Sequence, residues 1–108
     1  MSGDDLSWLT RWYLSQCDND WEHIHGVKIE TLDNPGWSLL IELADTELEG
    51  QAFERVTQGQ PSGSLEEWQR TGSWWIAAVE GTVFEAHCGP LDLPAVIGIF
   101  RRWAERAT

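Results

Sequence analysis

Residues 37–43, WSLLIEL, constrain the fold more than any other part of the sequence. Apolar side chains stand at every second position, at Trp37, Leu39, Ile41 and Leu43. Because successive side chains of a β-strand point to opposite faces of a sheet, this alternation predicts a strand with one buried face. The preceding segment, VKIETLD, alternates in the same way. Asn34-Pro35-Gly36 lies between them and predicts a hairpin with Pro35 and Gly36 at the central positions of a type II turn.

Helices are predicted at both ends of the chain. Residues 4–16 begin with two acids, which the helix dipole favours there, and continue with apolar residues at helical spacing. Residues 92–106 have Asp92 as an N-cap candidate, Pro94 in the first turn and arginines near the end. The expected buried stripe of this second helix is Leu93, Val96, Ile97, Phe100 and Ala104, with Trp103 at its edge.

A second hairpin is predicted from residues 73–81 and 82–89, with its turn at Glu80-Gly81. The expected fold class is therefore α+β, an antiparallel sheet of about four to six strands with the N-terminal and C-terminal helices packed on one face. A chain of 108 residues forms one domain, residues 1–108. Residues 45–72 fit no single pattern. Phe53 and Val56 indicate a short strand or a helical turn, and the composition of residues 58–64 indicates a loop. Ser64 and Glu67 could form a capping box or could belong to the loop.

The charge balance limits the classes of partner. The chain has 18 acidic and 7 basic side chains, a formal net charge of −11, whereas nucleic-acid binding requires a basic face. The acidity favours a basic protein partner, although solubility alone also explains it. We expect neither a membrane span nor a signal peptide, and two cysteines form no disulfide framework, so the predicted location is the cytoplasm.

Residues 17–37 concentrate the side chains that could carry chemistry. Asp18, Asp20 and Glu22 have the spacing of an EF-hand opening, but His23 and Ile29 stand where that loop needs glycine and glutamate. A zinc site could use Cys17, His23, His25, His87 and Cys88, yet no zinc-ligand spacing is present. His23 and His25 would point the same way on a strand. This leaves open a metal-binding module or metal-dependent enzyme that uses them with nearby carboxylates.

Catalysis by the chain itself has no supporting motif. No glycine-rich phosphate loop or nucleophile elbow occurs, and the acids after Cys17 disfavour its thiolate. We therefore expect no enzyme and assign no catalytic, cofactor or metal residue. The same stretch can instead form a recognition surface. In that hypothesis Trp21 and Trp37 form an apolar centre at one end of the sheet, after a bend at Gly26. The alternative is two separate turns, each with a buried tryptophan.

Residues 12–43 closely resemble the signature of the bacterial immunity protein 53 family. The resemblance rests on Trp12-Tyr13, Gln16-Cys17-Asp18, Asp20-Trp21-Glu22-His23, Gly26 and Thr31-Leu32-Asp33-Asn34-Pro35-Gly36-Trp37. The segment LDLPAVIGIFRRW, with Leu93, Phe100 and Trp103, is similar to the closing helix of the family.

This resemblance implies an antidote of a polymorphic toxin system, which binds a cognate toxin domain and blocks it. The expected partner is a basic toxin domain, with no nucleic acid and no membrane, and the oligomeric state is left open. The expected toxin-binding residues are Asp18, Asp20, Trp21, Glu22, His23, Asp33 and Trp37. The motif from Cys17 to His23 could equally be scaffold or a small-molecule site.

Overall fold

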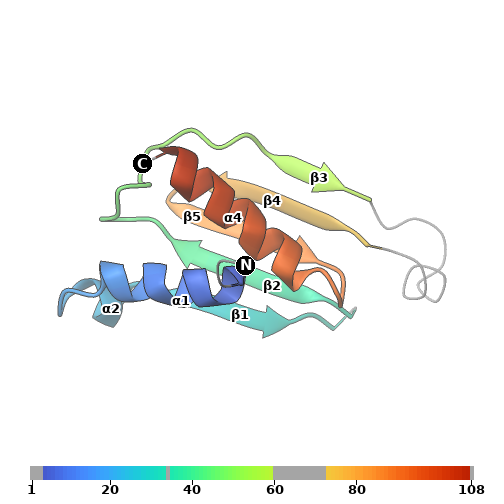
Figure 1. Cartoon of the computed structure of the whole chain (residues 1–108), viewed down its shortest axis with the longest axis horizontal. Helices are drawn as coiled ribbons and strands as arrows, with labels where there is room; N and C mark the ends of the chain where they lie inside the picture. The colour runs from blue at the N-terminus through green and yellow to red at the C-terminus, as the bar shows by residue number, and fades with distance from the viewer. Residues whose placement is uncertain (1–3, 34, 60–72, 108) are drawn as a thin grey trace.

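A computed structural model of the chain describes residues 4–33, 35–59 and 73–107. The helices are α1 (Asp5–Gln16), α2 (Trp21–Ile24) and α4 (Leu93–Ala107). The strands are β1 (Val27–Thr31), β2 (Trp37–Glu42), β3 (Val56–Gln58), β4 (Trp75–Glu80) and β5 (Val83–Cys88). They form a five-stranded sheet in the order β1-β2-β5-β4-β3, and every neighbouring pair is antiparallel (Figure 1).

Both predicted hairpins are confirmed. Strand β1 pairs with β2 from Val27 opposite Ile41 to Thr31 opposite Trp37. Strand β4 pairs with β5 as far as Glu80 opposite Val83, so the turn is Gly81-Thr82, one residue later than predicted; Gly81 has the positive φ of 62° that glycine adopts without strain. Val56 begins β3, so the short-strand alternative is the correct one there.

The type II turn predicted for the first hairpin is wrong. Gly36 has φ 158°, close to extended backbone, whereas the third position of a type II turn has φ near +80°. The Leu32 N–H donates to the Gly36 carbonyl at 3.0 Å, so the connection closes across more residues than a two-residue turn does. Asn34 lies outside the described residues, as do Ser64, Glu67 and most of the loop predicted at 58–64.

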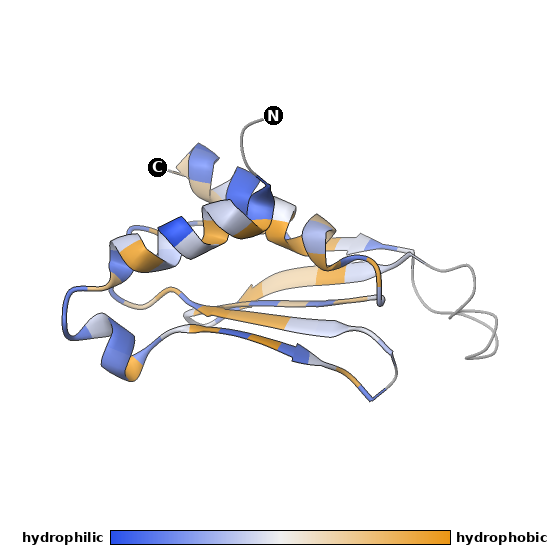
Figure 2. Ribbon diagram, turned by 60° about the horizontal axis from the view of Figure 1, so that its bottom comes forward, coloured by the Kyte–Doolittle hydropathy of each residue, from blue (hydrophilic) through white to orange (hydrophobic). Residues whose placement is uncertain are grey.

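Helices α1 and α4 lie on the same side of the sheet, as Figure 2 shows, and their buried residues include Leu9 and Trp12 in α1 and Val96 and Phe100 in α4. The predicted α+β architecture is therefore confirmed. Asp4 caps α1 by accepting a hydrogen bond from the Ser7 N–H at 2.7 Å, which is the role expected of an acid at that position. No helix within the described ranges 4–33, 35–59 and 73–107 has the length and apolarity to cross a membrane.

The core lies between these helices and the inner face of the sheet. Its fully buried side chains include Leu39, Ile41, Leu43, Leu48, Phe84, Ile97 and Phe100. One prediction for α4 needs correction, because Trp103 is not at the edge of the stripe but 3% exposed. Its indole Nε1–H donates to the Ala52 carbonyl at 2.8 Å, since the chain between β2 and β3 passes beside the helix.

Candidate functional site

The acids of the segment CDNDWEH fold their own backbone. Asp18 Oδ1 accepts hydrogen bonds from the Asp20 and Trp21 N–H groups at 3.0 and 2.9 Å. Glu22 reaches back and accepts from the Asp18 and Asn19 N–H groups, each at 2.9 Å. This reciprocal arrangement resembles a capping box, and it fixes the tight connection from α1 to α2, in which Asn19 has φ 79°.

These hydrogen bonds stabilise the ionised carboxylates. The Trp21 N–H, followed by the Asp20 N–H, holds the pKa of Asp18 below its ordinary value. The pKa of Glu22 is lowered first by its own backbone N–H and then, against some desolvation, by those of Asp18 and Asn19. Both side chains already have partners within the chain, so they serve the local fold before any external ligand.

Trp21 anchors the short helix α2 to the sheet. Its side chain is 3% exposed and contacts the rings of Trp12, Tyr13 and His25 at centroid distances of 6.2, 5.9 and 6.0 Å. The indole Nε1–H donates to the carbonyl of Ala44, just after β2, at 2.9 Å. A predicted binding residue is thus part of the core.

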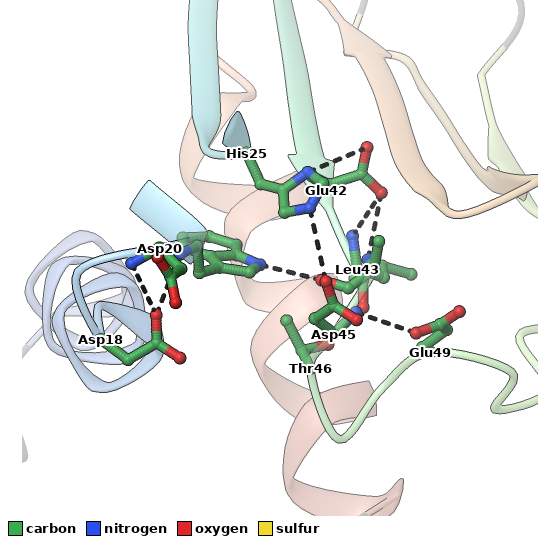
Figure 3. A network of polar contacts seen from close by, with 10 residues as sticks. Asp18, Asp20, His25, Glu42, Leu43, Asp45, Thr46 and Glu49 are labelled. Carbon is green, nitrogen blue, oxygen red and sulfur yellow. Dashed lines mark hydrogen bonds and ion pairs between the residues drawn. The ribbon is translucent and has the colours of Figure 1, made fainter. Parts of the chain in front are cut away.

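A polar network surrounds His25 beside this anchor (Figure 3). The imidazole lies between two carboxylates, with Nδ1 at 4.0 Å from Glu42 and Nε2 at 3.7 Å from Asp45. Glu42 Oε2 also accepts from the Leu43 and Ala44 N–H groups, both at 3.1 Å. Burial raises the pKa of Glu42, but the Thr82 hydroxyl, these N–H groups and His25 together bring it below its ordinary value.

Trp37 and Asp33 lie at the opposite end of β2 from this network. Trp37 pairs with Thr31 and Cys88, and its indole Nε1–H donates to the Pro90 carbonyl at 3.0 Å. Strand β2 covers six residues, roughly 17 Å at 3.3 Å per step, and separates the two tryptophans. The single surface centred on Trp21 and Trp37 is therefore wrong, because β1 runs straight along β2 after Gly26 instead of bending back.

The expected side-by-side placement of His23 and His25 on a strand is also wrong. His23 lies in α2, and His25 follows as its C-terminal cap. The Cys17 thiol donates to the Tyr13 carbonyl at 3.3 Å, while Cys88 is buried in β5. Across the described part of the chain, no group of three or more histidine, cysteine, aspartate or glutamate side chains is arranged to hold a metal ion.

A shallow cleft of about 560 Å³ opens beside the His25 network. Tyr13, Ile24 and His25 line one part of it, and Leu40, Glu42 and Val83 from the sheet line another. Ile24 is 76% exposed, so its side chain is accessible to a partner at this cleft. The lining mixes apolar side chains with the charged side chains of Lys28 and Glu42, an arrangement that suits binding better than proton transfer.

The model of the immunity protein 53 family matches residues 6–105, nearly the whole chain. The chain belongs to the immunity protein 53 family. No curated protein and no solved structure matches it. The resemblance predicted from residues 12–43 is thereby confirmed. Membership gives this immunity protein 53 domain a general immunity role.

Several residues of this immunity protein 53 domain were missed as candidates from sequence. The cleft and the network around it use Tyr13, Ile24, Leu40, Glu42 and Asp45, and none of these was among the expected toxin-binding residues. Glu42 follows Leu40 in the alternation of WSLLIEL, which places both on the face opposite the buried one. That alternation was the available signal, whereas the position of Ile24 depended on the unpredicted helix α2.

The buried thiol of Cys88 should be unreactive in the folded protein. Burial, with a smaller contribution from Asp92, raises the pKa of Cys88 to about 11 from an ordinary value of 9.0. At pH 8 the thiolate fraction of Cys88 should therefore be roughly 100-fold below that of an ordinary thiol, since each pKa unit is a factor of ten. Labelling a Cys17→Ser variant with a disulfide reagent should leave Cys88 unmodified until urea unfolds the protein.

The same shift predicts alkaline destabilisation. Because the folded state raises the pKa of Cys88, its contribution to stability is complete below pH 9.0 and is lost as the pH rises toward about 11. The melting temperature should fall across this range by more in the native chain than in Cys88→Val. Rapid labelling of Cys88 without denaturant would contradict the buried position.

Proposed function

We propose that this immunity protein 53 domain neutralises a cognate toxin domain of a bacterial polymorphic toxin system by binding it. The observation that carries the proposal is the family match over residues 6–105. In this proposal the protein acts in the cytoplasm of the producing cell as a stoichiometric inhibitor without turnover, and the toxin domain is basic. A net charge of −11 supports a basic partner through electrostatic steering.

In this proposal the predicted contact residues differ in how free their side chains are to bind a partner. Asp20 and His23 are exposed beside α2, and Asp33 is exposed at the far end of the sheet. Asp18, Trp21 and Glu22 are committed to hydrogen bonds and packing within the chain. If the motif contacts the toxin, it therefore does so chiefly through Asp20 and His23, while the other three hold them in place.

Coexpression with the toxin encoded by the adjacent gene tests the proposal. Cells that produce both proteins should survive, and cells that produce the toxin with an unrelated immunity protein should die. In a titration of the purified toxin, inhibition should be complete at an equimolar ratio, as expected for binding without turnover. A toxin that stays lethal beside folded immunity protein would refute neutralisation, and complete inhibition at a small fraction of equimolar would show catalysis instead.

A further inference from the structure

The sheet face opposite α1 and α4, here called the open face, is covered by neither of these helices (Figure 2), and α2 borders it only at the cleft beside His25. Its side chains alternate along each strand with those that reach the core. Residues Leu39, Ile41, Phe84 and Ala86 are fully buried beneath the helices, so their neighbours Leu40, Val83 and Glu85 point to the open face. Leu40, Ile76 and Val83 give this face a half-buried apolar centre.

Carboxylates surround that apolar centre. Glu30, Glu42, Glu80 and Glu85 lie on the open face, and Lys28 is its one ammonium group. Glu85 pairs directly with Leu40 and Ala78, which places Glu42 and Glu80 diagonally across from it on the two neighbouring strands. Such diagonal neighbours are roughly 7–8 Å apart, close enough for like charges to repel.

No lysine or arginine of the described residues forms an ion pair with these four carboxylates. Two of them instead lie beside histidines, Glu85 at 3.6 Å from His87 and Glu42 at 4.0 Å from His25. Repulsion among them opposes folding slightly, and the result is a negative field over a flat, partly apolar surface. A basic partner surface would cancel that repulsion when it binds, which is the charge complementarity that speeds and orients association.

The cleft beside His25 continues this surface, because Lys28, Leu40, Glu42 and Val83 line it and also lie on the open face. Leu40, Val83 and the exposed Ile24 offer apolar contact for the methylene groups of a long side chain. Glu42 offers an ionised carboxylate for the charged end. A lysine or arginine has this combination of an aliphatic stem and a cationic tip. The chemistry of the cleft therefore matches that of the face around it.

We infer that the open face is the docking surface for a basic surface of the toxin domain, with a lysine or arginine side chain of the toxin seated in the cleft against Glu42. This inference rests on the proposed function and specifies where and how the partner binds. It places the main contact on the sheet rather than on the motif at Asp18–His23. The motif then supports the wall of the cleft, since it holds Trp21 and the helix that carries Ile24.

The test measures association of the purified toxin with charge variants of the open face. Glu80→Lys/Glu85→Lys should slow association by about tenfold or more at low salt, and the difference should shrink as salt rises. Glu80→Gln/Glu85→Gln should fall between this variant and the native chain. The matched control is Glu47→Lys/Glu54→Lys, which makes the same charge change at two exposed positions away from the open face.

Melting curves accompany each variant, so that misfolding is separated from lost binding. If the lysine variant has a lowered melting temperature, the association rate of the glutamine variant decides the test, because that variant removes charge without reversing it. Native association rates in both open-face variants would overturn the inference, as would a loss confined to Asp20→Lys at α2. A native chain that does not bind the toxin would refute the proposed function itself. A dimer abolished by the open-face variants would show that a second copy occupies the face.

Discussion

Phe100→Ala should destabilise the protein by about 3–5 kcal/mol, as large-to-small changes at buried aromatic positions do. Phe100 is fully buried in α4, and its ring contacts those of Trp8, Trp12, Phe84 and Trp103 at centroid distances between 5.1 and 6.0 Å. It therefore joins α1, the sheet and its own helix, so the cavity cannot close without moving several aromatic rings. Domains of this size have a total stability of only about 5–15 kcal/mol.

Urea denaturation followed by tryptophan fluorescence measures this effect. The control is Leu91→Ala, which removes a side chain that is 90% exposed and should change the free energy of unfolding by less than about 0.5 kcal/mol. A Phe100→Ala variant as stable as the control would mean that the aromatic cluster is not the centre of the core.

Trp21→Ala should destabilise the protein by a similar amount, roughly 3–5 kcal/mol, although the sequence motif around Trp21 predicts a recognition surface. The substitution removes three aromatic contacts and leaves the Ala44 carbonyl without its indole donor. Trp21→Phe should destabilise the protein less, because it keeps part of the ring packing and loses chiefly the hydrogen bond to the Ala44 carbonyl. Thermal melting of both variants measures the difference.

Ile24→Ala is the matched control for Trp21, since it changes an exposed apolar side chain of the same short helix. It should melt like the native chain. If Trp21→Ala also melts normally but no longer binds the toxin, Trp21 is an interface residue and its anchoring role is wrong. If it melts early and its folded fraction binds normally, the motif is scaffold.

The hairpins and terminal helices could be predicted because their signals are local. The alternation at Trp37, Leu39 and Ile41 defines which face of β2 is buried whatever the strand packs against, since the side-chain period of a strand is two. Asp4 and Asp5 mark the start of α1 because the helix dipole favours acids there, although Asp4 is the N-cap and not the first helical residue. Segments of 11–18 residues contain this information without any long-range contact.

The candidate site could not be predicted in the same way. The sequence places Asp18, Trp21, Glu22 and Trp37 in one short motif, yet a single recognition surface requires knowing where each side chain goes in three dimensions. Asp18 and Glu22 turn inward to the backbone of their own loop, and Trp21 enters the core. A sequence does not distinguish an acid that bonds to the backbone of its own turn from an acid that binds a partner, because both roles use the same carboxylate side chain.

The sequence by itself determined the two terminal helices, the two hairpins and the family, because these follow from patterns between near neighbours in the chain. Only the tertiary structure decided that β2 lies between β1 and β5, which brings Leu40, Glu85 and Ala78 into one row on the open face. It also decided that Trp21 and Trp37 lie at opposite ends of β2. The physical reason is that pairings between distant residues determine the order of the strands and the residues at each end of the sheet. The free energy of these pairings depends on the whole packed core, so no single segment of the sequence encodes it.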